Sequence, residues 1–283
     1  MNDPVDRLEF SARGRRWQVE TAVPIDLAIP LDFVGPQPRF FAGTPASAEP
    51  LRAGSFTGSV AAGASCNCAS YTVAPHCHGT HTECVGHISA PAASLASFTP
   101  VAPALALLIS VEPGRFGANA TGPHTAVDDP VIERAALERA ATPWAAAPWT
   151  ALVVRTLPNP PSKRHRAYAG SACPAPYFRT DAMAWVVERG VNSLVVDLPS
   201  LDRADDGGAL AAHRIFWGMA AGAVDAATAT RADALVTELA YVPDEVSDGL
   251  YLLDLQVPAF VADAAPSRPV LYRLVDPAPE PAA

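Results

Sequence analysis

Short apolar runs, separated by polar and proline-rich stretches, set the pattern of the chain. Residues 104–111 (ALALLISV), 151–156 (ALVVRT) and 191–198 (VNSLVVDL) are almost continuously apolar, which is typical of strands buried on both faces. Residues 14–23 alternate apolar and polar positions and predict a half-buried strand. An apolar run at 26–31 and strands at 250–257 and 269–275 complete the predicted set.

Two helices are expected between these strands. Residues 129–141 place Val131, Ala135 and Leu137 on an apolar stripe, with Pro130 in the first turn. Residues 180–190 predict the second helix, with Thr180 as the expected N-cap and Gly190 at its C-terminal end. The order strand, helix, strand predicts an α/β fold with a largely covered sheet.

Composition narrows the function classes. The chain has 283 residues, is 49% hydrophobic and 17% charged, and can therefore bury a large core. A formal charge of −9 argues against nucleic acid or an anionic membrane as partner, since both require a basic face. Five cysteines, an odd number, together with the lack of a secretory signal or a long apolar span, predict a cytoplasmic protein.

A proline-rich segment at 36–54 is expected to be a long irregular loop. Loops of that length in compact domains are often functional. Phe33 precedes this segment and Phe40 and Phe41 lie within it, and the three could form the wall of a pocket for an aromatic substrate. Core packing is the alternative role for each of them.

Candidate chemistry is concentrated in one segment. Four of the seven histidines fall within residues 76–87, HCHGTHTECVGH. In an extended backbone Cys77, His81, Glu83 and His87 would share one face, and His76 and His78 the other. Imidazole and carboxylate suit zinc, manganese or iron, and a thiolate would favour zinc. A surface loop with adventitious metal affinity is the alternative.

The segment Gly79-Thr80-His81-Thr82-Glu83, followed by His87, resembles the HxGTHxDxPxH signature of the cyclase and kynurenine formamidase-like metal-dependent hydrolases. Other stretches resemble this family in the same order, from about residue 26 to 272. They are residues 26–31, Val153-Val-Arg-Thr156, Asp197-Leu-Pro-Ser-Leu-Asp202, His213, Thr237-Glu-Leu239, Gly249-Leu-Tyr251 and Asp263-Ala-Ala-Pro-Ser-Arg-Pro-Val270.

The resemblance implies a swivelling β/β/α domain with a mixed sheet and flanking helices, spanning residues 1–283 as one domain. It implies a homodimer or homotetramer that binds one or two divalent metal ions, zinc first and manganese as the alternative. Carried over residue by residue, it gives metal ligands and one proton shuttle, His87. The implied ligands are Cys77, His81, Glu83, His213 and Glu238.

The implied activity is cleavage of a C–N bond in a small amide by metal-activated water. The substrate would be an aryl formamide such as N-formylkynurenine, as in tryptophan catabolism, or a cyclic amide.

Three departures from the family pattern leave alternatives open. Cys77 stands where the family has its first His, Glu83 replaces Asp, and Val85 replaces Pro. Cys77 could be a soft ligand, or His76 or His78 could substitute for it. Alternatively, a metal site has been lost and the chain is an altered or inactive binding member of the fold. Asp225, inside an Ala-rich insertion, competes with Glu238 as the late acidic ligand.

Overall fold

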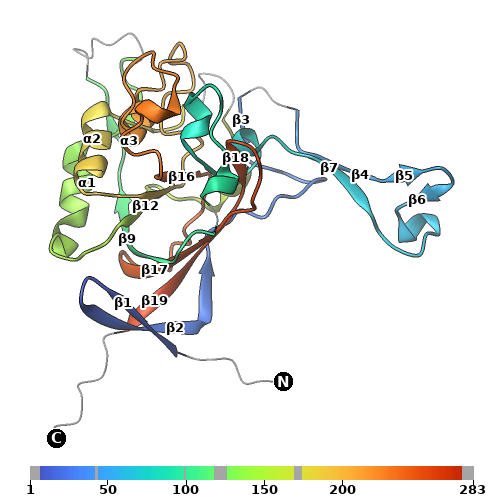
Figure 1. Ribbon diagram of the computed structural model, residues 1–283, viewed down its shortest axis with the longest axis horizontal. Helices are drawn as coiled ribbons and strands as arrows, with labels where there is room; N and C mark the ends of the chain where they lie inside the picture. The colour runs from blue at the N-terminus through green and yellow to red at the C-terminus, as the bar shows by residue number, and fades with distance from the viewer. Residues whose placement is uncertain (1–6, 42–43, 99, 118–125, 169–173, 276–283) are drawn as a thin grey trace, which may run out of the picture.

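The computed structural model describes residues 7–41, 44–98, 100–117, 126–168 and 174–275. Its core is a ten-stranded mixed sheet (Figure 1). In spatial order the strands are β1 (Arg7–Ala12), β2 (Arg15–Asp26), β19 (Arg268–Val275), β17 (Gly249–Gln256), β9 (Ala104–Val111), β12 (Ala151–Thr156), β15 (Ser193–Val196), β16 (Leu235–Glu238), β8 (His81–Glu83) and β18 (Ala264–Pro266).

The centre of this sheet is parallel and both flanks are antiparallel. Strands β9, β12, β15 and β16 run parallel to one another. Strand β17 pairs antiparallel with β9 on one flank, and β8 pairs antiparallel with β16 on the other. The prediction of an α/β fold with a mixed sheet is therefore confirmed.

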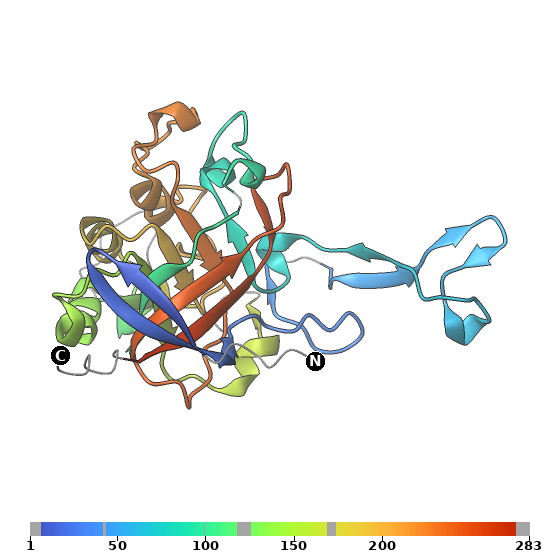
Figure 2. The ribbon, with the colours of Figure 1, turned by 60° about the horizontal axis from the view of Figure 1, so that its bottom comes forward.

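Three helices cover one face of the sheet: α1 (Arg134–Ala141), α2 (Thr180–Glu188) and α3 (Ala211–Trp217) (Figures 1 and 2). Leu107 of β9 shares a core cluster with Leu137 of α1 and Met183 of α2. Leu108, the next residue, belongs to the cluster on the opposite face. Because successive strand side chains point to opposite faces, a strand covered on both sides must be apolar throughout. This explains the continuous apolar run at 104–111.

Several predicted boundaries need correction. The helix expected at 129–141 begins only at Arg134, because Pro130–Ile132 forms strand β11 against β14 (Tyr177–Phe178). Thr180 is the first residue of α2, and the N-cap is Arg179, which makes no side-chain cap hydrogen bond. The run at 26–31 adds only an isolated bridge from Ala28 to Ala240 after β2 ends.

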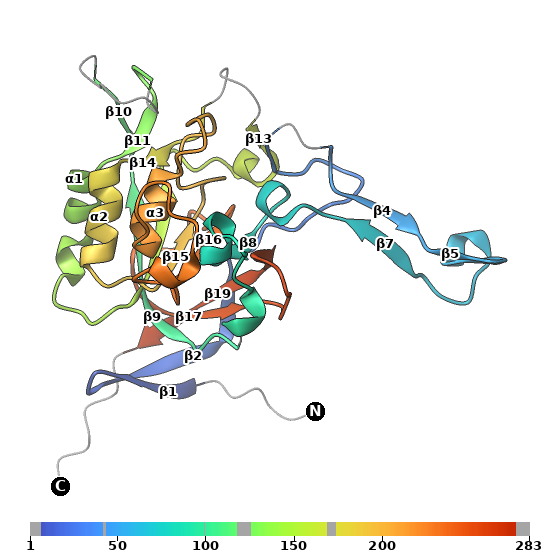
Figure 3. The ribbon, with the colours of Figure 1, turned by 45° about the horizontal axis from the view of Figure 1, so that its top comes forward.

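The segment expected to be an irregular loop instead forms much of an arm. Strands β4 (Ser47–Pro50) and β7 (Ala69–Thr72) pair antiparallel, and β5 (Arg52–Ala53) pairs with β6 (Phe56–Thr57) beyond them. This arm projects from the body in each ribbon view (Figures 1 to 3). The chain that returns along β7 leads directly into the histidine segment.

Two small sheets complete the strands. Strand β3 (Arg39–Phe40) pairs with β13 (Ala167–Tyr168), and β10 (Gly114–Arg115) pairs with β11. None of the helices in the described part of the chain combines the length and the apolar character needed to cross a bilayer.

Candidate metal centre

The pairing of β8 with β16 brings two distant acidic and imidazole-bearing segments together. His81 lies opposite Glu238 in the register, and Glu83 lies opposite Val236. His81 and Glu83 are two residues apart in a strand and therefore point to the same face. All three functional side chains of this pair of strands, His81, Glu83 and Glu238, are buried.

Glu83 is at the centre of the cluster. Its Oε1 lies 2.9 Å from Nε2 of His213, which comes from α3. Its Oε2 lies 3.0 Å from Nδ1 of His76 and 3.6 Å from Nδ1 of His87. His213 Nε2 is also 3.4 Å from Glu238 Oε1, and His81 Nε2 is 3.5 Å from Glu238 Oε2. Glu83 thus joins histidines from three separate elements.

Unsatisfied buried atoms mark this cluster. His81 Nε2, His213 Nε2 and both carboxylate oxygens of Glu83 are buried without a partner in hydrogen-bond geometry. Only two further atoms of this kind occur among the described residues, one each on Asn159 and Arg189. The 2.9 Å contact between Glu83 and His213 is therefore a close approach and not a well-aligned hydrogen bond. Buried polar groups without partners are costly, and a cation among these atoms would satisfy all four.

Asp202 positions His213. Its Oδ2 lies 2.7 Å from Nδ1 of His213, so Nε2 of that ring faces Glu83. The same carboxylate accepts hydrogen bonds from the backbone N–H groups of Ala212 and His213 at the start of α3. A carboxylate on the outer nitrogen of a metal-binding histidine fixes the tautomer and orientation of the ring.

We predict that Asp202→Asn weakens metal binding by roughly 10- to 100-fold, the usual effect of losing such an outer partner. Chelator competition on the purified protein measures this. Asp206→Asn is the matched control, because Asp206 accepts the same kind of backbone hydrogen bonds, from Gly208 and Leu210. Equal metal affinities in the two variants would show that Asp202 does not orient His213 for metal binding.

Asp263 makes the equivalent contact on the other side of the cluster. It precedes β18, and its Oδ2 lies 2.9 Å from Nε2 of His76 and 3.6 Å from Nδ1 of His87. Neither Asp202 nor Asp263 was expected as a site residue. Both lie inside stretches that resemble the family, and this position is the signal in the sequence that could identify them.

The expectation of an extended backbone from Cys77 to His87 is wrong. Residues Pro75–Cys77 form the 3-10 helix η2, and Val85–Ile88 form the 3-10 helix η3. Side chains therefore alternate between the two faces only within β8. As a result His76, from the face predicted to point away, enters the cluster.

Cys77 and Asp225 lie outside the cluster. Cys77 belongs to none of the ligand groups found among the described residues, and burial raises the pKa of its thiol, which disfavours the thiolate that binds metal. Asp225 caps the 3-10 helix η7 (Ala226–Thr228), accepting from the N–H of Ala227. His78 Nδ1 accepts the N–H of Ala74, and its Nε2 lies 2.8 Å from the carbonyl of Thr44.

The cluster favours positive charge. Burial alone would raise the pKa of the Glu83 carboxyl, but the charges of His87 and His213 hold it well below its usual range. Burial alone would lower the pKa of His213, but the charge of Glu83 and the hydrogen bond to Asp202 raise it well above its usual range. Burial alone would lower the pKa of His76, but the hydrogen bond to Asp263 and the nearby carboxylate of Glu83 raise it to about 10. Electrostatics of this kind attract a cation.

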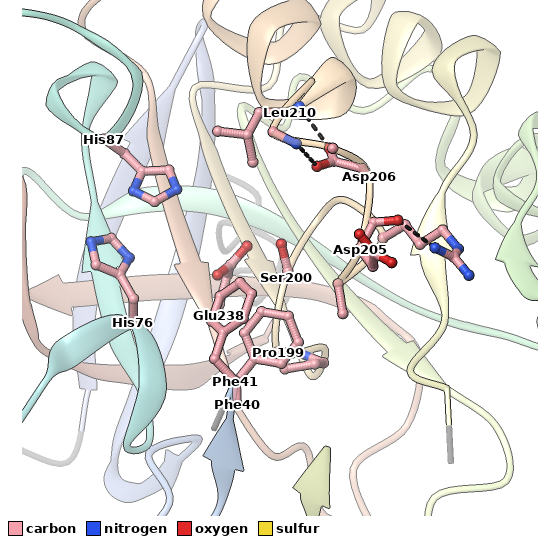
Figure 4. Close-up of a pocket in the computed structure, with 14 residues that line it drawn as sticks. Phe40, Phe41, His76, His87, Pro199, Ser200, Asp205, Asp206, Leu210 and Glu238 are labelled. Carbon is pink, nitrogen blue, oxygen red and sulfur yellow. Dashed lines mark hydrogen bonds between the residues drawn. The ribbon is translucent and has the colours of Figure 1, made fainter. Parts of the chain in front are cut away.

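A pocket opens onto this cluster. It has a volume of about 330 Å³, and its wall includes His76, His87, Glu238 and the aromatic pair Phe40 and Phe41 (Figure 4). The rings of Phe40 and Phe41 have centroids 4.2 Å apart. Phe33, the third candidate for this wall, instead contacts Tyr71 of the arm. A small molecule in the pocket would therefore meet imidazoles on one side and aromatic rings on another.

The donor set fits a divalent metal ion. Three groups have ligand atoms within 4.8 Å of one another: His76, His81 and Glu83; His76, His87 and Asp263; and Glu83, His87 and His213. Nitrogen and carboxylate oxygen are the donors that zinc and manganese accept. The unsatisfied atoms of His81, Glu83 and His213 are those that such an ion would use.

The fold and this cluster define an α/β protein with a buried site for a divalent cation beside a pocket. Residues 25–203 match the family model described as "Putative cyclase". The chain belongs to this cyclase family. The resemblance seen in the sequence is thereby confirmed.

Solved structures share the fold. One of a "novel cyclase" aligns with a TM-score of 0.59 and 15% identity, covering 89% of this chain and 87% of that one. Isatin hydrolase A from Ralstonia solanacearum gives 0.56 and 13%, covering 90% and 92%. A "predicted metal-dependent hydrolase" from Bacillus stearothermophilus gives 0.54 and 13%, covering 88% and 98%. A search of curated protein sequences finds no match.

Proposed function

We propose that the protein is a metal-dependent hydrolase that cleaves a C–N bond in a small amide. The observation that carries the proposal is the set of unsatisfied buried atoms on His81, Glu83 and His213 next to a pocket lined by His87. Membership of the cyclase family and a fold shared with isatin hydrolases and other metal-dependent hydrolases support it.

His76, His81, Glu83, His213 and Glu238 would hold the metal. A divalent ion among such ligands polarises a carbonyl group and lowers the pKa of water toward neutrality. The chain itself supplies the proton transfer. Nδ1 of His87 faces Glu83 and Asp263, so its Nε2 is the atom that delivers a proton to the departing amide nitrogen. The two carboxylate oxygens lie 3.6 Å from Nδ1 and favour this orientation of the ring through their charge.

The pocket favours a flat substrate. A volume of about 330 Å³ lies at the lower end of the range for small-molecule sites, and the tilted rings of Phe40 and Phe41 offer an aromatic wall. An aryl formamide and a cyclic amide such as isatin both present an amide carbonyl on a flat ring system. We favour zinc as the ion, because nitrogen ligands from several histidines suit it, with manganese as the alternative.

The test uses tag-free protein, because the histidine segment could bind metal from an affinity column. We predict stoichiometric zinc or manganese by elemental analysis, and hydrolysis of isatin or N-formylkynurenine that stops when the metal is removed. His87→Ala should retain the metal and lose about 10²- to 10⁴-fold in turnover, the usual contribution of a general acid or base.

His165→Ala is the control for this substitution, because His165 is exposed and lies outside the site. A wild-type rate in His87→Ala would end the proton-transfer assignment. Loss of metal as well as turnover would make His87 a ligand instead.

The second candidate function is an inactive binding member of the same fold. This function is suggested by Cys77, which occupies a ligand position of the family motif. However, the ligand atom of His76 lies close enough to those of His81 and Glu83 to share a metal ion with them. Cys77 is therefore not needed to complete the site. A metal-free protein that hydrolyses neither substrate would favour this reading.

A further inference from the structure

A second cavity, of about 410 Å³, lies where three parallel strands end. Thr156 is the last residue of β12, Asp197 follows β15 directly, and Pro113 follows β9. All three residues line the cavity. Ligands of open α/β sheets bind outside the carboxyl ends of their strands. None of the residues that line this cavity lines the pocket at the metal centre.

The floor of the cavity is a buried ion pair. Lys163, the only lysine of the chain, places its Nζ 2.8 Å from Oδ2 of Asp197 and 2.8 Å from Oγ1 of Thr156. The N–H and the hydroxyl of Thr156 also donate to Asp197. Lysine and aspartate are rarely buried unless paired. Here Lys163 neutralises the charge of Asp197, and Thr156 donates hydrogen bonds to both of its carboxylate oxygens.

Two arginines at the cavity have no such compensation. Arg115 donates to the backbone carbonyl of Asp128, and the guanidinium of Arg166 lies over the ring of Tyr168, 5.7 Å from its centroid. Within the described residues, neither arginine makes an ion pair with a carboxylate. The ionisable groups in the lining are therefore Arg115, Lys163 and Arg166 against Asp197, a local charge of +2.

This positive cavity is in a chain whose formal charge is −9. Acidic residues outnumber basic ones overall, so the composition does not explain two guanidinium groups at one cavity that have no carboxylate partner among the described residues. Guanidinium groups bind carboxylate and phosphate oxygens through paired hydrogen bonds. The volume is within the range of small-molecule sites and too small for a macromolecular partner.

We propose that this cavity is a binding site for a small dianion with oxygen acceptors, either a phosphate group or a dicarboxylate. Arg115 and Arg166 neutralise the two negative charges. Lys163 and Thr156 form the polar floor on which the ligand rests. The site is separate from the metal centre, although the two are linked by the backbone from Asp197 and Leu198, which line the cavity, to Pro199 and Ser200, which line the pocket.

Calorimetric titration of the full chain tests this proposal, with inorganic phosphate and with succinate in separate experiments at constant ionic strength. The variants are Arg115→Gln and Arg166→Gln. Arg164→Gln is the matched control, because Arg164 lies in the same 3-10 helix η6 (Pro161–His165) as Lys163, is exposed and packs over Tyr241 instead of the cavity. Each variant removes one positive charge, so all three change non-specific attraction equally.

We expect saturable binding of at least one anion by the wild-type chain and by Arg164→Gln. Loss of a charge-assisted hydrogen bond should weaken binding by about tenfold or more in each of the other two variants. Binding of phosphate alone identifies a phosphate site, and binding of succinate alone a dicarboxylate site. The proposal is overturned if neither anion binds saturably, or if Arg115→Gln and Arg166→Gln bind as tightly as Arg164→Gln. An anion held at the metal centre would bind all variants alike and so count against it.

Discussion

Glu83→Gln is expected to abolish both metal binding and hydrolysis while leaving the fold intact. Among the described residues, Glu83 is the one side chain that lies within 3.6 Å of His76, His87 and His213 together, and it is fully buried. Glutamine keeps the shape but removes the negative charge, and its NH₂ group would direct donors at imidazoles that must face a cation. The loss of metal affinity should exceed the roughly 10- to 100-fold effect expected for an outer partner such as Asp202.

Elemental analysis and turnover measure this effect together, and the thermal unfolding of the metal-free proteins shows whether the fold survives. Glu49→Gln is the control, because Glu49 is exposed on β4 of the arm. Retention of stoichiometric metal in Glu83→Gln would show that the cluster is not the metal centre. Loss of metal together with collapse of the fold would make Glu83 a structural residue first.

Much of the fold follows from local pattern. The strands predicted at 104–111 and 151–156 coincide with β9 and β12, because a strand buried on both faces leaves a continuous apolar run that no exposed element can carry. The sequence does not show the helix boundary at Arg134, since whether Pro130–Ile132 forms a strand depends on its partner Tyr177–Phe178, whose paired residues lie 46 positions further along the chain. Pairing between distant segments leaves little trace in a short window of sequence.

The candidate site likewise contains residues that the local sequence predicts and residues that it does not. His81 and Glu83 were placed on one face correctly, because they share a strand. His213 and Glu238 come from α3 and β16, and only the resemblance to a family linked them to the histidine segment. Asp202 and Asp263 act through other side chains, and such partners are set by the three-dimensional arrangement instead of by spacing along the chain.

The alternation of side chains predicted for this segment breaks at a defined place. The chain is not extended from Cys77 onward, because a 3-10 turn begins at Pro75 and rotates the residues that follow. Gly79 then adopts a φ of +114°, a conformation that glycine tolerates and other residues rarely adopt. The direction of the side chains before Gly79 is therefore independent of the alternation in β8.

This change of direction gives the last prediction: substitution of three consecutive ligand-type positions should separate three roles. His76→Ala should lose metal affinity by about tenfold or more, because its imidazole lies beside His81 and Glu83. Cys77→Ser should bind metal like the wild type. His78→Ala should keep the metal but lose about 1–3 kcal/mol of stability, because its ring pairs with the backbone of Thr44 and Ala74.

Chelator competition and thermal unfolding of the three variants, measured side by side, decide whether His76 or Cys77 is the metal ligand. If Cys77→Ser loses the metal and His76→Ala keeps it, the thiol is the ligand. Cys77 then takes the place of the first histidine of the family motif. If His76→Ala alone loses it, the chain has replaced the first histidine of the motif with the residue one position earlier. The short helix that begins at Pro75 makes that replacement possible, because it turns His76 toward Glu83 without moving β8.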